Sequence, residues 1–346
     1  MKPGQHVADF EASFASYVGA RHCIAASNGT VTLQAALIAL GVKPGDRVAL
    51  PPLTMAATSI AVLNVGAVPV FVDVGKRAWL MNSLPPGEPR FAVPVSLYGL
   101  HAPLYGGAVV DDAAQTLRKH GPADFTSYSL QHSKILQTGE GGMLVTDDES
   151  LAEAARSYLS LGYAMGGKAR IDKAAIKSPD AVRHVRWPAI NGRMADCTAA
   201  LGLERLAHAD RLLADRREAW QRYARTVEGC AWLTPQHVPE GRQHDGWAYA
   251  VACDTPARAK WLQAEMVAEG AEMPYGAWRL TYHEPPFREI GNALTEPDEW
   301  DAEGNPVGLC VNAESLQPRI VAFQTNDRIT ADRNARALRR VIARAT

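Results

Sequence analysis

Residues 22–40, HCIAASNGTVTLQAALIAL, place a short apolar run directly before a helical pattern. The run at 22–27 has the length of a buried strand. After the polar tetrapeptide SNGT, Leu33, Leu37 and Leu40 fall on one face of a helix. A strand followed at once by a helix is the repeating unit of α/β folds. This stretch therefore predicts an α/β protein.

The same kind of apolar run recurs up to residue 148. The further runs are RVALP (47–51), AVPVFVDV (67–74), RFAVPVSLYG (90–99), GGAVVDD (106–112), DFTSYSL (124–130) and GGMLVTDD (141–148). A second helical pattern, AATSIAVLN, lies between the earliest of them. Strand–helix alternation predicts a mostly parallel sheet with helices on both faces. We expect seven strands, with the last antiparallel because the glycines before it allow a sharp reversal.

The rest of the chain is more helical. We expect a helix at 149–161, an exposed basic loop near 163–187, one long helix from 194 to about 223 and a closing amphipathic helix at 330–345. The long helix would connect two domains. We predict a large domain over 1–215 and a smaller C-terminal α/β domain over 216–346.

Composition limits the class of protein. The 346 residues are 47% hydrophobic and 21% charged, and the net charge of −1 predicts no attraction to nucleic acid or to an anionic membrane. The five cysteines are scattered and odd in number, which is typical of a reduced, cytoplasmic chain. No segment approaches the roughly 18 apolar residues of a membrane span, and the start resembles no signal peptide. The ten histidines show no metal-binding spacing.

The tetrapeptide SNGT (27–30) is a candidate anion site. Ser27 or Asn28 can cap the following helix, and Gly29 lets a ligand approach the backbone closely. The free N–H groups of the first helical turn would then hold a phosphate. A helix cap without a ligand explains the same residues, so both interpretations stay open.

VVDDAAQ (109–115) places two aspartates at the end of a strand pattern. Functional groups of α/β enzymes gather where parallel strands end. A carboxylate there can pair with a protonated ring nitrogen, as pyridoxal phosphate requires. Side-chain alternation favours Asp112 over Asp111, which would point to the opposite side. The alternative is that both aspartates cap the next helix.

SYSLQHSKILQTGEGG (127–142) adds an amine beyond another strand end. A partly desolvated lysine such as Lys134 can form a Schiff base with an aldehyde cofactor. Ser129 can offer a hydroxyl to a phosphate. His132 is either a residue at the rim of such a site or a packing residue. The alternative of a solvated surface lysine is weakened because the polar run lies within a predicted buried sheet.

INGRM (190–194) precedes the long helical pattern. Asn191 and Arg193 can reach an anion or cap that helix, and the pattern alone does not decide between these roles. We keep Arg193 and His132 as candidates for contact with a substrate.

In combination these segments resemble the DegT/DnrJ/EryC1/StrS family of pyridoxal-phosphate-dependent sugar aminotransferases. The resemblance spans most of residues 10–215, and its motifs occur in the order of the family. They are SNGT, VPVSLYG, VVDDAAQ, SYSLQHSKILQTGEGG and INGRM. The resemblance implies the transferase fold type I of pyridoxal-phosphate enzymes, with residues 1–215 as the cofactor-binding domain.

The resemblance also implies roles around the cofactor ring. It implies that Lys134 carries the cofactor as an internal aldimine and that Asp112 pairs with the pyridine nitrogen. Gln115 would lie near the ring hydroxyl. In the family, the residue at the position of Met55 is commonly aromatic and stacks on the cofactor ring. The thioether of Met55 can still pack against that ring.

The phosphate of the cofactor would be held by residues from two chains. The resemblance implies that Gly29, Thr30 and Ser129 bind it within one chain. It implies that Asn191 reaches across a dimer interface to the phosphate of the partner subunit. We therefore expect a homodimer with shared active sites.

The implied reaction is an aminotransfer. Its partners would be a small-molecule amino donor, usually glutamate in this family, and a keto acceptor, typically a nucleotide-linked keto sugar. Two alternatives stay open. One is a dehydratase or decarboxylase that uses the same cofactor, although retention of Lys134 argues against the sugar dehydratases of the family. The other is a non-catalytic relative that acts as a binding or scaffold subunit.

Overall fold

The seven predicted apolar runs form one sheet in the computed structural model, which describes residues 4–84, 89–118, 121–163, 188–288, 299–300 and 306–345. Its strands are β1 (His22–Ala26), β2 (Arg47–Leu50), β3 (Val68–Phe71), β4 (Phe91–Ala92), β5 (Ala108–Asp112), β6 (Phe125–Ser129) and β7 (Gly142–Thr146). Their order across the sheet is β1-β7-β6-β5-β4-β2-β3. The predicted α/β class and the strand count are confirmed.

The direction of the strands also follows the prediction. The β2–β3, β2–β4, β4–β5 and β5–β6 pairs are parallel. The last strand, β7, is antiparallel to both β1 and β6. Because β5 and β6 run the same way, their carboxyl ends meet at one edge of the sheet, where α/β proteins bind ligands.

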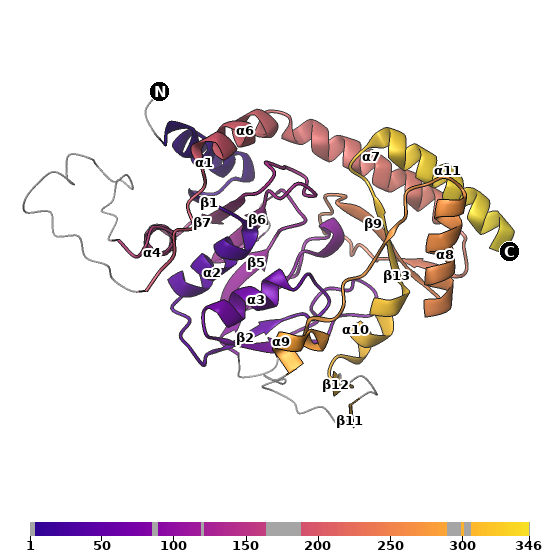
Figure 1. Ribbon diagram of the computed structural model, residues 1–346, viewed down its shortest axis with the longest axis horizontal. Helices are drawn as coiled ribbons and strands as arrows, with labels where there is room; N and C mark the ends of the chain where they lie inside the picture. The colour runs from indigo at the N-terminus through magenta and orange to yellow at the C-terminus, as the bar shows by residue number, and fades with distance from the viewer. Residues whose placement is uncertain are drawn as a thin grey trace, which may run out of the picture.

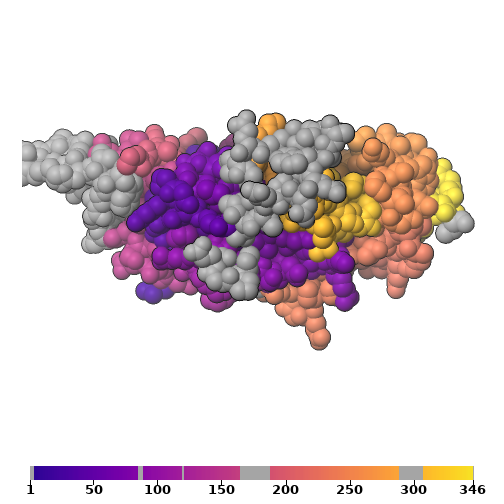
Figure 2. Space-filling view, turned by 90° about the horizontal axis from the view of Figure 1, so that it is seen from below, coloured from indigo at the N-terminus to yellow at the C-terminus, as the bar shows by residue number. Residues whose placement is uncertain are grey.

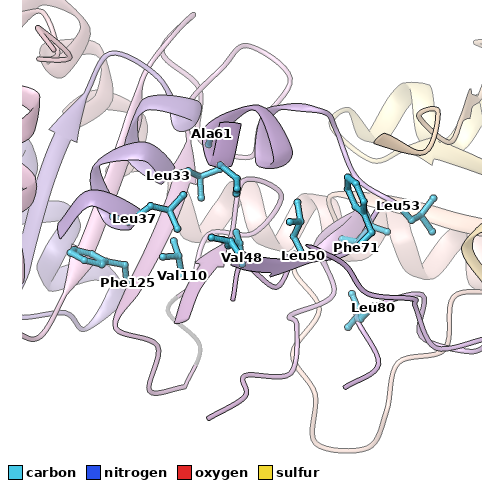
Figure 3. Close-up of a cluster of buried hydrophobic side chains, with 14 of the residues drawn as sticks. Leu33, Leu37, Val48, Leu50, Leu53, Ala61, Phe71, Leu80, Val110 and Phe125 are labelled. Carbon is cyan, nitrogen blue, oxygen red and sulfur yellow. The ribbon is translucent and has the colours of Figure 1, made fainter. Parts of the chain in front are cut away.

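Helices cover both faces of this sheet (Figure 1). The first face carries α2 (Gly29–Ala39), α3 (Ala57–Asn64) and α4 (Glu149–Leu159), and the second carries α1 (Gln5–Val18) and α6 (Asp196–Leu206). Leu33 and Leu37 of α2 pack over Val110 and Phe125 (Figure 3). Tyr128, three residues after Phe125 on β6, packs into the cluster on the second face. This alternation is the period of two of a β-strand. Burial of each large apolar side chain contributes about 1.5–3 kcal/mol.

A second sheet lies in the C-terminal part of the chain. Its order is β10 (Tyr275–Gly276), β13 (Ile320–Gln324), β9 (Ala248–Cys253) and β8 (Leu233–Pro235). It shares a core with α7 (Ala209–Val227), α8 (Pro256–Ala268) and α11 (Arg328–Ala345). In the space-filling view this orange and yellow part lies beside the indigo and purple part that carries the first sheet (Figure 2).

Shorter elements complete the described chain. They are η1 (Leu97–Gly99), η2 (Thr281–His283), α9 (Pro285–Arg288), β11 (Glu299–Trp300), β12 (Pro306–Val307), α10 (Val311–Leu316) and η3 (Gln317–Arg319). No helix in the ranges given above is both long and apolar enough to cross a membrane.

The predicted long helix from 194 to 223 is in fact two helices, so this prediction is wrong. The chain leaves α6 at Leu206, where His208 N donates to Arg205 O at 3.1 Å in a tighter turn, and α7 begins at Ala209. The break lets α6 pack against α1 while α7 packs on the second sheet. The predicted boundary between the two domains, at 215/216, falls within α7 and stays a prediction. The predicted loop falls almost wholly on residues 164–187, outside the described residues.

Candidate active site

A cavity of about 790 Å³ opens at the carboxyl ends of β5 and β6. The start of α2 and the loop after β6 form its sides, and residues from the C-terminal part complete it. The lining residues that matter for chemistry are mostly polar or aromatic, with Gly29 and Met55 as the exceptions: Gly29, Thr30, Met55, Thr58, Tyr98, Asp112, Gln115, Ser129, Lys134, Trp247 and Trp278. Seven segments that are distant in sequence therefore meet in one pocket.

Lys134 lines this cavity and is 8% exposed. Its backbone N–H donates to Gln131 O at 2.8 Å, which fixes the turn after β6. Its Nζ lies 5.4 Å from the centre of the Trp247 ring. Burial lowers the pKa of the amine, while Asp112 and Glu140 act in the opposite direction. Lys134 is thus a desolvated amine, the kind that reacts with carbonyl groups.

Asp112, at the end of β5, is the acid of the cavity and is 5% exposed. One carboxylate oxygen, Oδ2, accepts from Thr58 Oγ1 at 2.7 Å, and Oδ1 accepts from Ala114 N at 3.2 Å. Burial raises the pKa of this carboxyl, and the hydrogen bonds and the charge of Lys134 act against that rise. A cationic ring nitrogen placed beside it would favour the carboxylate further.

Asp111 is fully buried and does not line the cavity, as strand alternation predicts. Its Oδ1 accepts from Ser96 Oγ at 3.0 Å, and its Oδ2 has no hydrogen-bond partner among the described residues. Burial raises the pKa of Asp111 to about 7 against the opposing effects of His101 and Ser96. Two adjacent aspartates therefore sit in different environments on opposite sides of one strand.

We expect Asp111→Asn to raise the free energy of unfolding at pH 8 by on the order of a few kcal/mol. The folded chain holds a proton on Asp111 up to about pH 7, whereas the unfolded chain releases it near the usual value of 3.8. The stability that this proton contributes is complete below pH 3.8 and is lost as the pH rises through 7. The amide resembles the protonated acid at every pH. Thermal unfolding at pH 5 and pH 8 would check this, and an equal difference at both values would contradict it.

The start of α2 forms a close cradle against the end of β6. Asn28 caps the helix, because its side-chain oxygen accepts from Val31 N at 3.0 Å. A Cβ added to Gly29 would lie 2.9 Å from Ser129 Cβ. Glycine is therefore required for the approach of these two segments. Gly29, Thr30 and Ser129 line the same cavity, so the start of a helix and a hydroxyl are brought together, as an anion site requires.

The remaining candidates divide into two groups. Gln115 lines the cavity, and its Oε1 accepts from Tyr98 N at 2.6 Å. Met55 also lines it and is 49% exposed. Three other candidates, Asn191, Arg193 and His132, are exposed and do not line the cavity of their own chain.

Sequence reasoning missed the aromatic side chains that line the cavity and the hydrogen-bond partner of Asp112. Thr58 lies on the predicted helix at 56–64, and nothing in that pattern marks its hydroxyl as the neighbour of Asp112. Tyr98 belongs to the quoted SLYG motif, where the tyrosine drew no attention. Trp247 and Trp278 come from the C-terminal part of the chain, where no local motif points to the cavity.

Comparisons of the chain with protein families, with known sequences and with solved structures all lead to aminotransferases or related enzymes. A model of the DegT/DnrJ/EryC1/StrS aminotransferase family matches residues 1–338. The chain is 33% identical over 275 residues to GDP-perosamine synthase of Caulobacter vibrioides, covering 72% of this chain and 69% of that protein. It is 31% identical over 278 residues to dTDP-3-amino-3,4,6-trideoxy-alpha-D-glucose transaminase of Micromonospora megalomicea, covering 72% and 69%. The solved structure of 3-amino-5-hydroxybenzoic acid synthase superposes with a TM-score of 0.82 at 25% identity, covering 99% of this chain and 91% of that one.

Proposed function

The chain belongs to the DegT/DnrJ/EryC1/StrS aminotransferase family, and on that premise we propose that it aminates a keto sugar, free or nucleotide-linked, with glutamate as the donor. The names of the two relatives above, a GDP-perosamine synthase and a dTDP-amino-sugar transaminase, support a sugar acceptor. One observation carries the proposal. A buried amine, Lys134, and a buried carboxylate, Asp112, face a single cavity beside an anion cradle.

The residues of the cavity fit pyridoxal 5′-phosphate, the cofactor of this class of aminotransferase. Gly29, Thr30 and Ser129 line the cavity together at the start of α2, where free backbone N–H groups would suit an anion such as the phosphate. Thr30 lies in the same turn. Lys134 would hold the aldehyde group, and Asp112 the ring nitrogen. When bound, the cofactor supplies an electron sink and a carrier for the amino group.

The side chains of this chain then have distinct tasks. Burial lowers the pKa of Lys134, so more of its amine is unprotonated at neutral pH, and this form can take a proton at Nζ. Thr58 fixes the direction of the Asp112 carboxylate through its 2.7 Å hydrogen bond. The buried position of both groups excludes water and strengthens their electrostatic effect.

The test of this function uses the purified chain saturated with pyridoxal phosphate and then freed of excess cofactor. We expect a visible absorbance band that glutamate bleaches, with one 2-oxoglutarate released per site. Keto sugars, free and nucleotide-linked, should then restore the band. Failure of glutamate and of all other amino acids to bleach a band that is present would contradict an aminotransferase.

We also propose that the active site is shared between two chains of a homodimer. Asn191 is exposed and does not line the cavity of its own chain, which supports a role toward the partner subunit. Its side-chain oxygen accepts from Arg193 Nε at 3.0 Å, so the amide group is already oriented. The five scattered cysteines, all unpaired, support a cytoplasmic location for this dimer.

A mixture of two inactive variants tests the shared site. In a mixed dimer of Lys134→Ala and Asn191→Ala, one site would contain an intact Lys134 together with an intact Asn191 from the other chain. We expect mixed dimers isolated after co-expression to show about half of the activity per dimer of the unaltered chain, because one of two sites is native. No restoration in isolated mixed dimers would place Asn191 in the site of its own chain.

A further inference from the structure

The segment that carries Lys134 belongs to no helix or strand. It follows β6 as an irregular turn, in which the backbone N–H of Lys134 donates to Gln131 O at 2.8 Å. The carbonyl groups of Ser133 and Lys134 accept from no backbone N–H in the described part of the chain. Secondary structure therefore does not hold the two peptide groups beside the reactive amine, and their carbonyls need other donors.

Both carbonyls accept from side chains of the C-terminal part of the chain. Arg216, in α7, donates from Nη2 to Lys134 O at 3.3 Å. Trp247, directly before β9, donates from its indole Nε1 to Ser133 O at 3.0 Å. Arg216 Nη1 also donates to Trp247 O at 3.2 Å, so the two donor residues are joined to each other. One connected pair of side chains thus holds two consecutive carbonyls at the reactive lysine.

The position of Arg216 is itself fixed. Its Nη1 donates to Thr325 Oγ1, directly after β13, at 3.4 Å, and that hydroxyl donates to Trp247 O at 2.8 Å. Gly246 has a φ of +70°, and a Cβ added there would lie 3.2 Å from the carbonyl carbon of Arg216. The backbones of α7 and of the segment before β9 are therefore in close contact. The guanidinium is in place before any ligand binds.

Arg216 is a buried cation with neutral partners. It is 6% exposed, and burial lowers the pKa of its guanidinium to about 10, so the group stays protonated at neutral pH. Its acceptors among the described residues are Lys134 O, Trp247 O and Thr325 Oγ1, none of which carries a full charge. Burial of such a charge is costly, and an aliphatic side chain would fill the same space without that cost. What arginine supplies is a planar group that reaches several acceptors at once.

We propose that Arg216 is a positioning residue, which holds the peptide group of Lys134 from α7 and so directs the amine of that lysine into the cavity. The inference rests on the proposed function, in which Lys134 holds the cofactor, and deepens it. Arg216 is not among the described residues that line the cavity, so it acts only through Lys134. The direction of the amine then depends on how the C-terminal part packs against the first sheet.

The test compares two forms of the cofactor on the cofactor-free chain. Pyridoxal phosphate binds through its phosphate and ring and through a bond that the Lys134 amine forms with its aldehyde, with loss of water. Pyridoxamine phosphate has no aldehyde and uses only the phosphate and ring contacts. We expect Arg216→Met to raise the Kd of pyridoxal phosphate about tenfold, the usual effect of one lost hydrogen bond from a charged donor. The Kd of pyridoxamine phosphate should stay within about twofold.

A second substitution covers the case in which the methionine variant does not fold. Arg216→Gln keeps a polar group in the buried site, but its side chain is too short to reach all three acceptors. It should give the same split between the two forms of the cofactor. Equilibrium dialysis measures each Kd without any catalytic turnover.

Arg222→Met is the matched control. Arg222 is another cation of α7, and its partners Glu218 and Asp332 lie on α7 and α11. This variant removes ion pairs of the same helix without touching the segment of Lys134. It should change neither Kd.

Three results would overturn the inference. They are an unchanged Kd of pyridoxal phosphate in both Arg216 variants, an equal rise in Kd for both forms of the cofactor, and the same split in Arg222→Met. Lys134→Ala separates this failure from that of the proposed function. If that variant binds pyridoxal phosphate as tightly as the unaltered chain, the role of Lys134 itself is wrong.

Discussion

Lys134→Ala is expected to lower the turnover by at least roughly 10⁴-fold, because the variant loses both the amine that holds the cofactor and the base that moves the proton. The visible band of the cofactor should be absent and should not return when more pyridoxal phosphate is added. The expected loss is specific to Lys134 because this lysine is buried in the cavity. Lys134 is 8% exposed in the cavity, and no other cation among the described residues lines it.

Two controls belong with this variant. Lys260→Ala removes an exposed lysine of α8 and should leave the band and the turnover unchanged. Lys134→Arg keeps the positive charge beside Asp112 but offers a guanidinium that stays protonated, so it should be as inactive as alanine. A band of normal intensity in Lys134→Ala would show that another amine holds the cofactor.

Asp112→Asn is expected to lower the turnover by about 10²–10³-fold, the usual effect of removing one preorganised electrostatic group. The amide has nearly the same shape and can still accept from Thr58, but it carries no charge to hold a proton on the ring nitrogen. Because Lys134 is unchanged, the visible band should persist. Single-turnover reaction with glutamate, followed by the loss of the band, measures the effect directly.

Asp111→Asn provides the matched control for this substitution. Both variants replace a carboxyl group by an amide in adjacent residues of β5, but only Asp112 lines the cavity. The control should keep its turnover near that of the unaltered chain. Equal losses in the two variants would mean that the effect comes from the sheet and not from the contact between Asp112 and the cofactor.

The first sheet was predictable because its signals are local. Each strand is an apolar run with turn residues on both sides, and residues such as Phe125 and Tyr128 alternate between two cores as the period of two requires. The positions of Asp112 and Lys134 followed from the same logic, since Asp112 ends β5 and Lys134 follows β6, and the carboxyl ends of these two parallel strands meet. The sequence pattern alone therefore predicts that Asp112 and Lys134 lie near each other.

Other features depend on contacts between distant segments. The break between α6 and α7 near His208 has no signal in the apolar spacing, which runs through it: Ala209 and Leu213 of α7 still pack in the cluster of α6, and only the later part of α7 joins the C-terminal core. The hydrogen bond from Thr58 to Asp112 joins residues 54 positions apart. The wall of Tyr98, Trp247 and Trp278 exists only because the C-terminal part packs against η1. No local window of sequence carries this information.

The most direct measurement locates the bond between the chain and its cofactor. The chain would be loaded with pyridoxal phosphate, reduced with borohydride, digested and mapped by mass spectrometry. Our account predicts that the added mass lies on the peptide that contains Lys134, in a yield close to one per chain. Added mass on any other lysine, or none on a chain that had shown the visible band, would contradict it.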